Sequence, residues 1–170
     1  MELYEPSSFN QVSPTFPPDI PQFCASLEDT YQEVCYDTAG VHAYGRLPDM
    51  RQAVATCEEV PEVFRKPCIS ALGQDIFFVK NGAVSEIISL CTEAAPYASA
   101  CVSGALEASI TSDPHARHAP EICNALNRKE KDLCYALLKE KLMSLYGMER
   151  TQTYCGLFPE EYDGKCRSKE

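Results

Sequence analysis

Apolar side chains recur at helical spacing ahead of two cysteines in this chain. The residues three, four and seven positions before Cys57, and again before Cys91, are all apolar. They are Met50, Ala53, Val54, Val84, Ile87 and Ile88. Side chains at these spacings lie on one face of an α-helix, whereas a strand requires alternation with period two. The pattern therefore predicts a helix that ends near each of these two cysteines.

Small or apolar residues follow four other cysteines, and helix-breaking residues come after them. The runs are Ala-Gly at 39–40, Ala-Leu-Gly at 71–73, Gly-Ala at 104–105 and Ala-Leu-Leu at 136–138. Small side chains let two helices approach closely, so we expect close helix packing at these runs. Breakers follow at Gly45 and Pro48, at 81–82, at 112–114 and at Gly147. The chain is therefore predicted to consist of helices joined by short turns.

The ten cysteines are spaced as a repeat. They are Cys24, Cys35, Cys57, Cys68, Cys91, Cys101, Cys123, Cys134, Cys155 and Cys166. They form five segments of two, and the first cysteine of each segment recurs after 32 to 34 residues. A fixed period in this range is typical of stacked supersecondary units.

Two further positions recur inside these segments. Three residues after the first cysteine, all five copies have an apolar residue: Leu27, Val60, Ala94, Leu126 and Phe158. Six or seven residues after it, four copies have an aromatic residue: Tyr31, Phe64, Tyr97 and Tyr162. We call this second position the aromatic slot. The fourth copy departs from the rule, because Glu130 occupies its slot.

The two cysteines of one segment cannot form a disulfide on one unbroken helix. Eleven helical residues span about 16 Å, whereas a disulfide requires Cα atoms within about 4.4 to 6.8 Å. Three segments contain a proline, Pro61, Pro96 or Pro159, which suits the first turn of a new helix. We therefore expect a helix that ends near the first cysteine, a tight turn, and a second helix that begins near the second cysteine.

Pairing within segments uses every cysteine. The rival pairing across the longer intervals, such as Cys35 with Cys57, leaves Cys24 and Cys166 without partners, so we favour the first. The sequence thus predicts an all-α fold, an α-solenoid of about five antiparallel helical hairpins with a 33-residue repeat. Each hairpin is stapled by one disulfide, and the last repeat is truncated. This repeat domain is expected over residues 23–170.

The array from residue 24 to residue 166 resembles the disulfide-stapled, Sel1-like and tetratricopeptide-type solenoids of secreted bacterial proteins. The resemblance rests on the hairpin period and on one disulfide per repeat, and it implies architecture alone. Cysteine spacing is longer here than in those families. Mitochondrial coiled-coil-helix-coiled-coil-helix proteins also pair cysteines on helical hairpins, with nine residues between them, and only Cys91 and Cys101 have that spacing.

Persistent disulfides require an oxidising environment. We therefore expect an extracytoplasmic location, namely secreted, at the cell surface or in the periplasm, with the mitochondrial intermembrane space as the alternative. Another hypothesis is that the thiols bind copper or zinc. The spacings typical of zinc sites are absent from the sequence, and His115 and His118 have no identifiable third ligand nearby. We expect no metal and no cofactor, and keep a thiol-based copper or zinc storage protein as the alternative function.

Residues 1–22 differ from the rest of the chain. They contain five of the twelve prolines and no helical period, which is typical of an extended arm or linker. The arm carries Tyr4, Phe9 and Phe16, which are candidates for contact with a partner. The alternatives are a strap over the chain's own first hairpin and a link to an upstream region.

Charge and motifs exclude several classes of function. The net charge is −10, with residues 1–113 at −11 and residues 114–170 at +1, so a surface that neutralises nucleic-acid phosphates is not expected. No apolar stretch is long enough to span a membrane. Motifs of catalytic nucleophiles, phosphate loops and metalloproteases are absent. The sequence predicts a non-enzymatic module for protein–protein interaction or a structural scaffold, assembling through its arm and open repeat ends.

Overall fold

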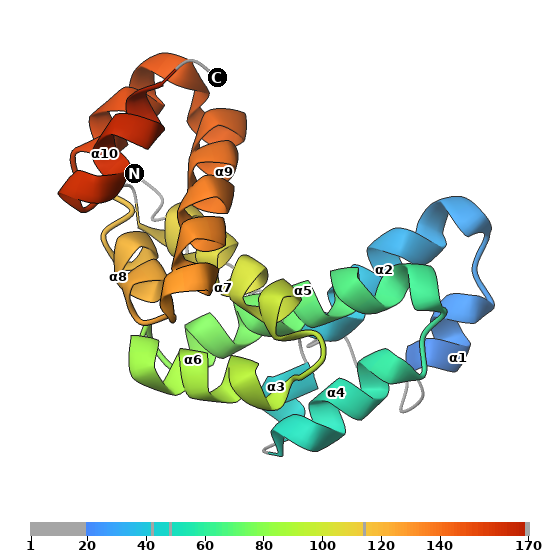
Figure 1. The fold of residues 1–170 in the computed structure, drawn as a ribbon. Helices are drawn as coiled ribbons and strands as arrows, with labels where there is room; N and C mark the ends of the chain where they lie inside the picture. The colour runs from blue at the N-terminus through green and yellow to red at the C-terminus, as the bar shows by residue number, and fades with distance from the viewer. Residues whose placement is uncertain (1–19, 42, 48, 114, 169–170) are drawn as a thin grey trace, which may run out of the picture.

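The computed structural model describes residues 20–41, 43–47, 49–113 and 115–168. Within these residues every regular element is a helix and none is a strand, which confirms the predicted all-α class (Figure 1). The arm residues Tyr4, Phe9 and Phe16 lie outside the described residues. None of the described helices combines the length and the apolar character that a membrane crossing requires.

Ten helices follow one another in the described part of the chain. They are α1 (Ile20–Ala25), α2 (Asp29–Val41), α3 (Ala43–Arg46), α4 (Met50–Glu58), α5 (Glu62–Val79), α6 (Val84–Glu93), α7 (Ala98–Ser112), α8 (His118–Asn124), α9 (Arg128–Cys155) and α10 (Glu160–Arg167). Helix α9 is interrupted at Gly147, whose φ of 74° and ψ of 172° are not helical. A positive φ suits glycine, which has no Cβ. The last part of α9 therefore turns back from the first (Figure 1).

Five pairs of consecutive helices are each joined by one disulfide. The bonds are Cys24–Cys35 (α1–α2), Cys57–Cys68 (α4–α5), Cys91–Cys101 (α6–α7), Cys123–Cys134 (α8–α9) and Cys155–Cys166 (α9–α10). Their Cα atoms are 5.4 to 5.6 Å apart, so the chain reverses between the two cysteines of each bond. Nine of the ten cysteines are buried and Cys35 is partly buried, so the disulfides are part of the core.

The second helix of each pair begins three to six residues before its cysteine, earlier than the sequence predicts. In α5, for example, Glu62 is the first residue and Cys68 lies in the second turn. Pro61 occupies the N-cap position with a φ of −53°. Because this φ is close to the helical value, the helix can start directly after the proline. Pro159 precedes α10 in the same way.

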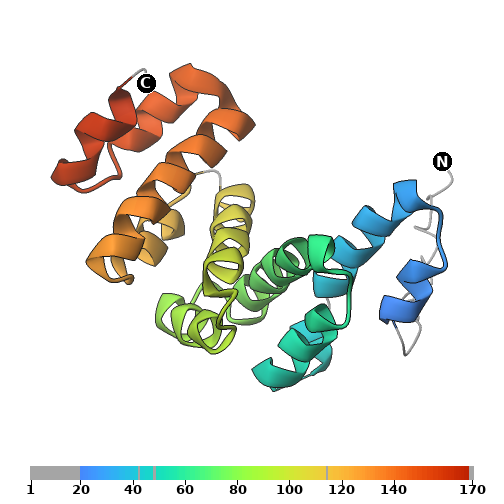
Figure 2. The same cartoon turned by 45° about the vertical axis from the view of Figure 1, so that its right-hand side comes forward.

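Glycines set the packing of α2, α5 and α7, the second helices of the first three pairs, which lie in a row (Figure 2). Gly40 on α2 lies against the α5 backbone at Cys68, and Gly73 on α5 lies against the α7 backbone at Cys101. Each glycine follows the second cysteine of its own pair by five residues. A Cβ at either glycine would overlap the carbonyl oxygen of the second cysteine of the next pair. These contacts therefore repeat in one register along the row.

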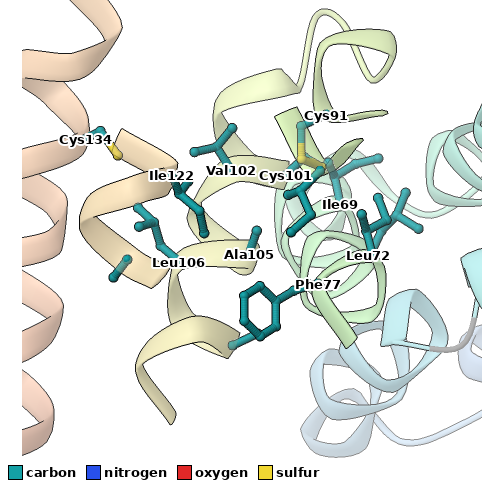
Figure 3. Packing of buried hydrophobic residues seen from close by; sticks show 14 of the residues in the cluster. Ile69, Leu72, Phe77, Cys91, Cys101, Val102, Ala105, Leu106, Ile122 and Cys134 are labelled. Atoms are coloured by element: carbon teal, nitrogen blue, oxygen red, sulfur yellow. A yellow bond between two sulfur atoms is a disulfide. The ribbon is translucent and has the colours of Figure 1, made fainter. Parts of the chain in front are cut away.

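The interior of the row is apolar. Figure 3 shows the packed side chains between α5, α7 and α8, which include Ile69, Leu72, Phe77, Val102, Ala105, Leu106 and Ile122. Small and branched side chains interlock here, because alanine leaves space that leucine and isoleucine fill. This central part of the core positions the walls of the site described below.

Helix α9 does not continue the row. At the position where α2 and α5 carry the glycine that lies against the next pair, α7 carries Leu106, whose larger side chain lines the space toward α9. Helix α9 contacts α7 further along, where Lys141 Nζ lies 2.6 Å from Glu107 Oε2 and the Tyr146 hydroxyl donates to the Ile110 carbonyl at 3.0 Å. In Figures 1 and 2, α9 diverges from the row and carries α10 with it. The contact between α7 and the start of α9 is therefore looser than the contacts within the row.

Candidate functional site

The residue that follows the second cysteine of a pair packs on the aromatic slot of the next pair. Tyr36, which follows Cys35, has its ring centroid 4.8 Å from that of Phe64. Tyr135 and Tyr162 make the same contact at 4.2 Å, with 20° between their ring planes. Stacked or tilted rings at these separations stabilise a contact beyond the burial of their area. A ring from the slot therefore closes the interface between the first two pairs and between the last two.

The interface between the third and fourth pairs has no such ring. Val102 follows the second cysteine of the third pair, and the exposed Glu130 occupies the slot of the fourth. Both residues line a cavity of about 190 Å³ between α6, α7 and the start of α9. We call it the open-slot groove. Its apolar walls are formed by Ile88, Val102, Leu106, Leu126, Leu133 and Leu137.

Glu130 serves the start of α9 instead of the interface. Asn127 is the N-cap residue, and its Oδ1 accepts a hydrogen bond from the Glu130 backbone N–H at 3.2 Å. The Asn127 side-chain amide donates in return to the Glu130 carboxylate. This reciprocal arrangement is a variant of the capping box, and the helix dipole also favours a carboxylate in the first turn. The Glu130 carboxylate is thereby bonded at the start of α9, and the slot of the fourth pair supplies no ring to the groove that Glu130 lines.

One exposed apolar side chain lines the groove, and three cations lie next in sequence to its lining residues at the start of α9. Leu133 is 67% exposed although it lines the groove. Arg128 and Lys129, in the first turn of α9, are exposed, and Lys131 is half-buried. Interfaces that bind protein commonly have an apolar centre and a polar rim. Apolar walls beside three cations suit a partner segment that carries an apolar side chain next to acidic residues.

The size and lining of the groove favour a side chain over a small substrate. Sites for drug-sized ligands measure roughly 300 to 1,000 Å³, and this groove measures about 190 Å³. Glu130 is the charged residue of its lining. Among the described residues, no group of three or more His, Cys, Asp or Glu side chains is placed to hold a metal ion. The groove therefore offers shape and apolar surface rather than reactive groups.

A second, larger cavity of about 500 Å³ lies between α9 and α10, and its polar atoms are already bonded. Lys139 Nζ donates to the carbonyls of Lys165 at 2.9 Å and Ser168 at 2.8 Å, which satisfies the C-terminal end of α10. The Tyr162 hydroxyl donates to Asp132 Oδ1 at 2.9 Å. Burial raises the pKa of Tyr135 to about 12, so its hydroxyl stays protonated. These groups stabilise the last helix pair.

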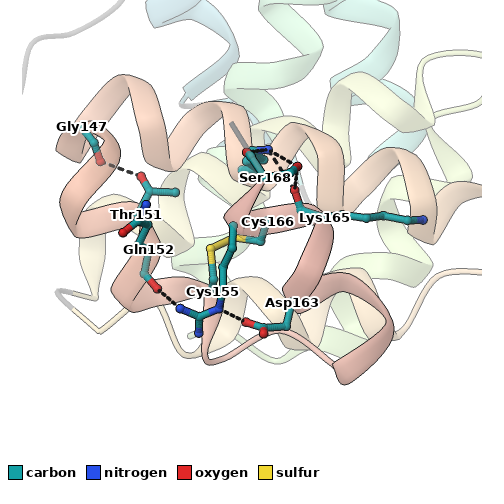
Figure 4. Close-up of a disulfide and its surroundings, with 10 residues drawn as sticks. Gly147, Thr151, Gln152, Cys155, Asp163, Lys165, Cys166 and Ser168 are labelled. Atoms are coloured by element: carbon teal, nitrogen blue, oxygen red, sulfur yellow. Dashed lines mark hydrogen bonds and ion pairs between the residues drawn. A yellow bond between two sulfur atoms is a disulfide. The ribbon is translucent and has the colours of Figure 1, made fainter. Parts of the chain in front are cut away.

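Figure 4 shows how the last pair is held together around Cys155–Cys166. Arg167 donates to Asp163 Oδ1 at 2.7 Å and to the Gln152 carbonyl at 3.3 Å. The first bond lies within α10, and the second joins α10 to the last part of α9. Together with the disulfide, they make this pair a compact end to the described chain.

The two histidines singled out in the sequence belong to the α7–α8 connection. Asp113 accepts hydrogen bonds from the backbone N–H groups of His115 at 2.9 Å and Arg117 at 3.1 Å. These bonds, the one from His115 foremost, lower the pKa of Asp113 to about 2. His118 Nδ1 lies 3.2 Å from Glu121 Oε2. The His115 backbone thus helps to shape the connection, and the His118 side chain pairs with Glu121 in the first turn of α8.

All ten cysteines are in disulfides, so none is present as the thiolate that binds copper or zinc. No protein-family model, curated protein or solved structure matches the chain. The resemblance to Sel1-like and tetratricopeptide-type repeats therefore remains a prediction. Function has to be inferred from the geometry of this chain alone.

The sequence carries one signal for the groove, a departure from the repeated pattern, which on its own does not indicate a site. Glu130 interrupts the aromatic slot, and Val102 is smaller than the tyrosines at the equivalent positions 36 and 135. Either departure could be a neutral variation. They form a groove only because positions 102 and 130 lie on either side of one interface between helix pairs, and that proximity is visible only in three dimensions.

Proposed function

We propose that this chain is a non-enzymatic protein-binding repeat, a disulfide-stapled α-solenoid of five helical hairpins that acts outside the cytoplasm. The five locally closed helix pairs and the repeated register of Gly40 and Gly73 support the repeat architecture. The five buried disulfides support an oxidising compartment. As a scaffold unit, the chain would use its repeat surface to hold a partner protein.

The open-slot groove is the observation that carries the binding role. At the first and last interfaces between pairs, the ring in the slot comes from the chain itself. In the open-slot groove, Val102 and Glu130 line the cavity and neither supplies a ring. A partner side chain that enters the groove would complete the interface. Burial of one large apolar side chain contributes about 1.5 to 3 kcal/mol. The cations at 128, 129 and 131 would favour acidic residues beside it.

Titration of the full-length protein with N-acetyl-phenylalaninamide tests whether the groove accepts a ring. Two-dimensional ¹H–¹⁵N NMR spectra should show concentration-dependent shifts for the amides of Val102, Leu126 and Leu137. N-acetyl-alaninamide, which has the same backbone but no ring, should leave them unchanged. Equal responses to both compounds, or shifts confined to other helices, would show that the groove does not select an aromatic side chain.

Filling the slot from within should abolish this binding. In Glu130→Phe the new ring occupies the position that Phe64 and Tyr162 occupy at the other interfaces, so it should cover Val102. Glu130→Gln keeps the partner of Asn127 without adding a ring, and it is the matched control. We expect the phenylalanine variant to lose the NMR response while the glutamine variant retains it. Unchanged binding by Glu130→Phe would contradict the proposed site.

A further inference from the structure

We infer that the groove of one copy receives an aromatic side chain from the N-terminal arm of a second copy, so that the chain associates head to tail with itself. This inference rests on the proposed function of the groove and names its partner. The structure gives the acceptor, a cavity with one missing ring. The sequence gives the donor, an arm that carries three rings and precedes the first helix.

The groove has the size of a single aromatic ring. An apolar cavity of about 150 Å³ is large enough to bind benzene, and the groove measures about 190 Å³. The arm supplies Tyr4, Phe9 and Phe16 from a segment rich in proline. Proline limits the conformations of the free segment, which lowers the entropic cost of fixing it on a surface. A ring presented in this way matches the vacancy opposite Val102.

Charge also matches between arm and rim. Glu2 and Glu5 flank Tyr4, and residues 1–19 contain no basic side chain. The start of α9 carries Arg128, Lys129 and Lys131, which are next in sequence to Asn127 and Glu130 of the groove lining. Opposite charges around an apolar contact direct association and favour one orientation. Insertion of Tyr4 would bring its two neighbouring carboxylates to the side of the groove where these cations lie.

The arm is better placed to enter the groove of a second copy than the groove of its own chain. The arm joins α1, whereas the groove lies between α6, α7 and α9, so that α2 and α5 separate the two (Figure 2). An arm that folded back would pass helix pairs with exposed carboxylates, such as Glu58, Glu59 and Glu62 at the α4–α5 turn. Like charges oppose that path. Between copies, the acidic end of one chain meets the more basic end of the next.

The contact would join different surfaces of the two copies. An interface of this heterologous kind leaves a free arm on one copy and a free groove on the other. Further copies can then add until a ring closes or the chain ends. The oligomer size should consequently rise with protein concentration, and it should fall with added salt because salt screens the contact between arm and rim.

Sedimentation velocity of full-length proteins over a concentration series tests the inference. The wild type should form dimers and larger species, and Glu140→Gln, which removes an exposed carboxylate of α9 outside the groove, should behave like it. The full-length variant Tyr4→Ser/Phe9→Ser/Phe16→Ser and the variant Glu130→Phe should both associate at least about tenfold more weakly, since each removes one side of a buried ring contact. Circular dichroism spectra that match the wild type would show that both variants are folded.

A synthetic peptide of residues 1–19 separates this inference from the proposed function. Added to the triple-serine variant, the peptide should shift the amides of Val102, Leu126 and Leu137, and peptides with single serine substitutions should identify the ring that enters. If N-acetyl-phenylalaninamide binds the groove but the arm peptide does not, the proposed binding function of the groove is supported and the inference about the arm is wrong. A wild type that stays monomeric at every concentration would also overturn it, since the arm would then have no second copy to enter.

Discussion

At the scale of single residues, glycine determines how closely the second helices of adjacent pairs approach. Gly104 on α7 lies against the α5 backbone, where a Cβ would overlap the carbonyl oxygen of Ser70. Gly73 makes the reciprocal contact from α5 to α7 at Cys101. Neither helix can therefore accept even a methyl group at this crossing without moving its backbone. The exposed Gly164 on α10, by contrast, has open space around its Cα.

Alanine substitution at these glycines should have opposite effects. Gly104→Ala should lower the free energy of unfolding by about 2 kcal/mol, because the new methyl group overpacks the α5–α7 contact. Gly164→Ala places the same methyl group in solvent and should stabilise α10 by up to about 1 kcal/mol, since alanine is the better helix former. Urea unfolding followed by circular dichroism measures both. A Gly104→Ala protein as stable as the wild type would mean that α5 and α7 do not touch as described.

At the scale of elements, the connections between helices depend on a few polar groups. Asp113 follows α7 and holds the α7–α8 connection through the backbone N–H groups of His115 and Arg117. Those bonds require an ionised carboxylate to be at full strength, because a carboxylate is the stronger acceptor. They lower the pKa of Asp113 from 3.8 to about 2. This connection should consequently respond to acid.

A lowered pKa gives the pH dependence its direction. Above pH 3.8 the carboxylate is ionised in both the folded and the unfolded chain, so its contribution to stability is complete. As the pH falls from 3.8 towards 2, the unfolded chain takes up the proton first, and this contribution is lost. We expect Asp113→Asn to lose less stability than the wild type over that interval. Urea midpoints at pH 5, 4, 3 and 2 measure the difference, and Glu140→Gln, an exposed carboxyl on α9, should follow the wild type.

The sequence predicts which segments are helical better than it predicts where each helix begins and ends. Period-3.6 spacing before Cys57 and Cys91 predicts α4 and α6, because it depends on which side chains face the core. The start of α5 at Glu62 was predicted too late, because a proline at the N-cap permits immediate helix formation and the cysteine imposes no boundary. The uneven packing of α9 was not predicted. It depends on Leu106, which is an ordinary apolar helix residue until a neighbouring helix defines the space around it.

At the scale of the whole molecule, each disulfide joins the two helices of one pair, whereas the packing contacts that stabilise a pair also come from its neighbours. Helix α5 packs against α2 on one side and α7 on the other, whereas α10 packs against α9 at the end of the described chain. A helix that packs between two neighbours stabilises both of them, whereas a helix at the end stabilises one. The open-slot groove lies between α7 and α9, where the packing between neighbouring pairs is looser. Its existence could not be predicted from any one segment.

Removal of single disulfides should show this difference in position. The double variants Cys57→Ala/Cys68→Ala and Cys155→Ala/Cys166→Ala each open a loop of similar length, so the chain-entropy cost is about 3 kcal/mol in both. Hydrogen exchange should nevertheless differ. The central variant should lose protection in α2, α5 and α7, whereas the terminal variant should lose it in α10 and the end of α9. Equal loss of protection along the whole chain in both variants would contradict a stepwise sharing of stability.

The short spacing within each disulfide also affects how the chain can be made. The two cysteines of every bond are 10 or 11 residues apart, and each pair is complete before the next begins. A chain that emerges N-terminus first from a ribosome or a translocation channel exposes its cysteines in that order. An oxidant of the compartment can therefore take two electrons from the two thiols of each pair and join them before the next cysteine has emerged. Native pairing then needs little later isomerisation, although ten cysteines allow very many other pairings.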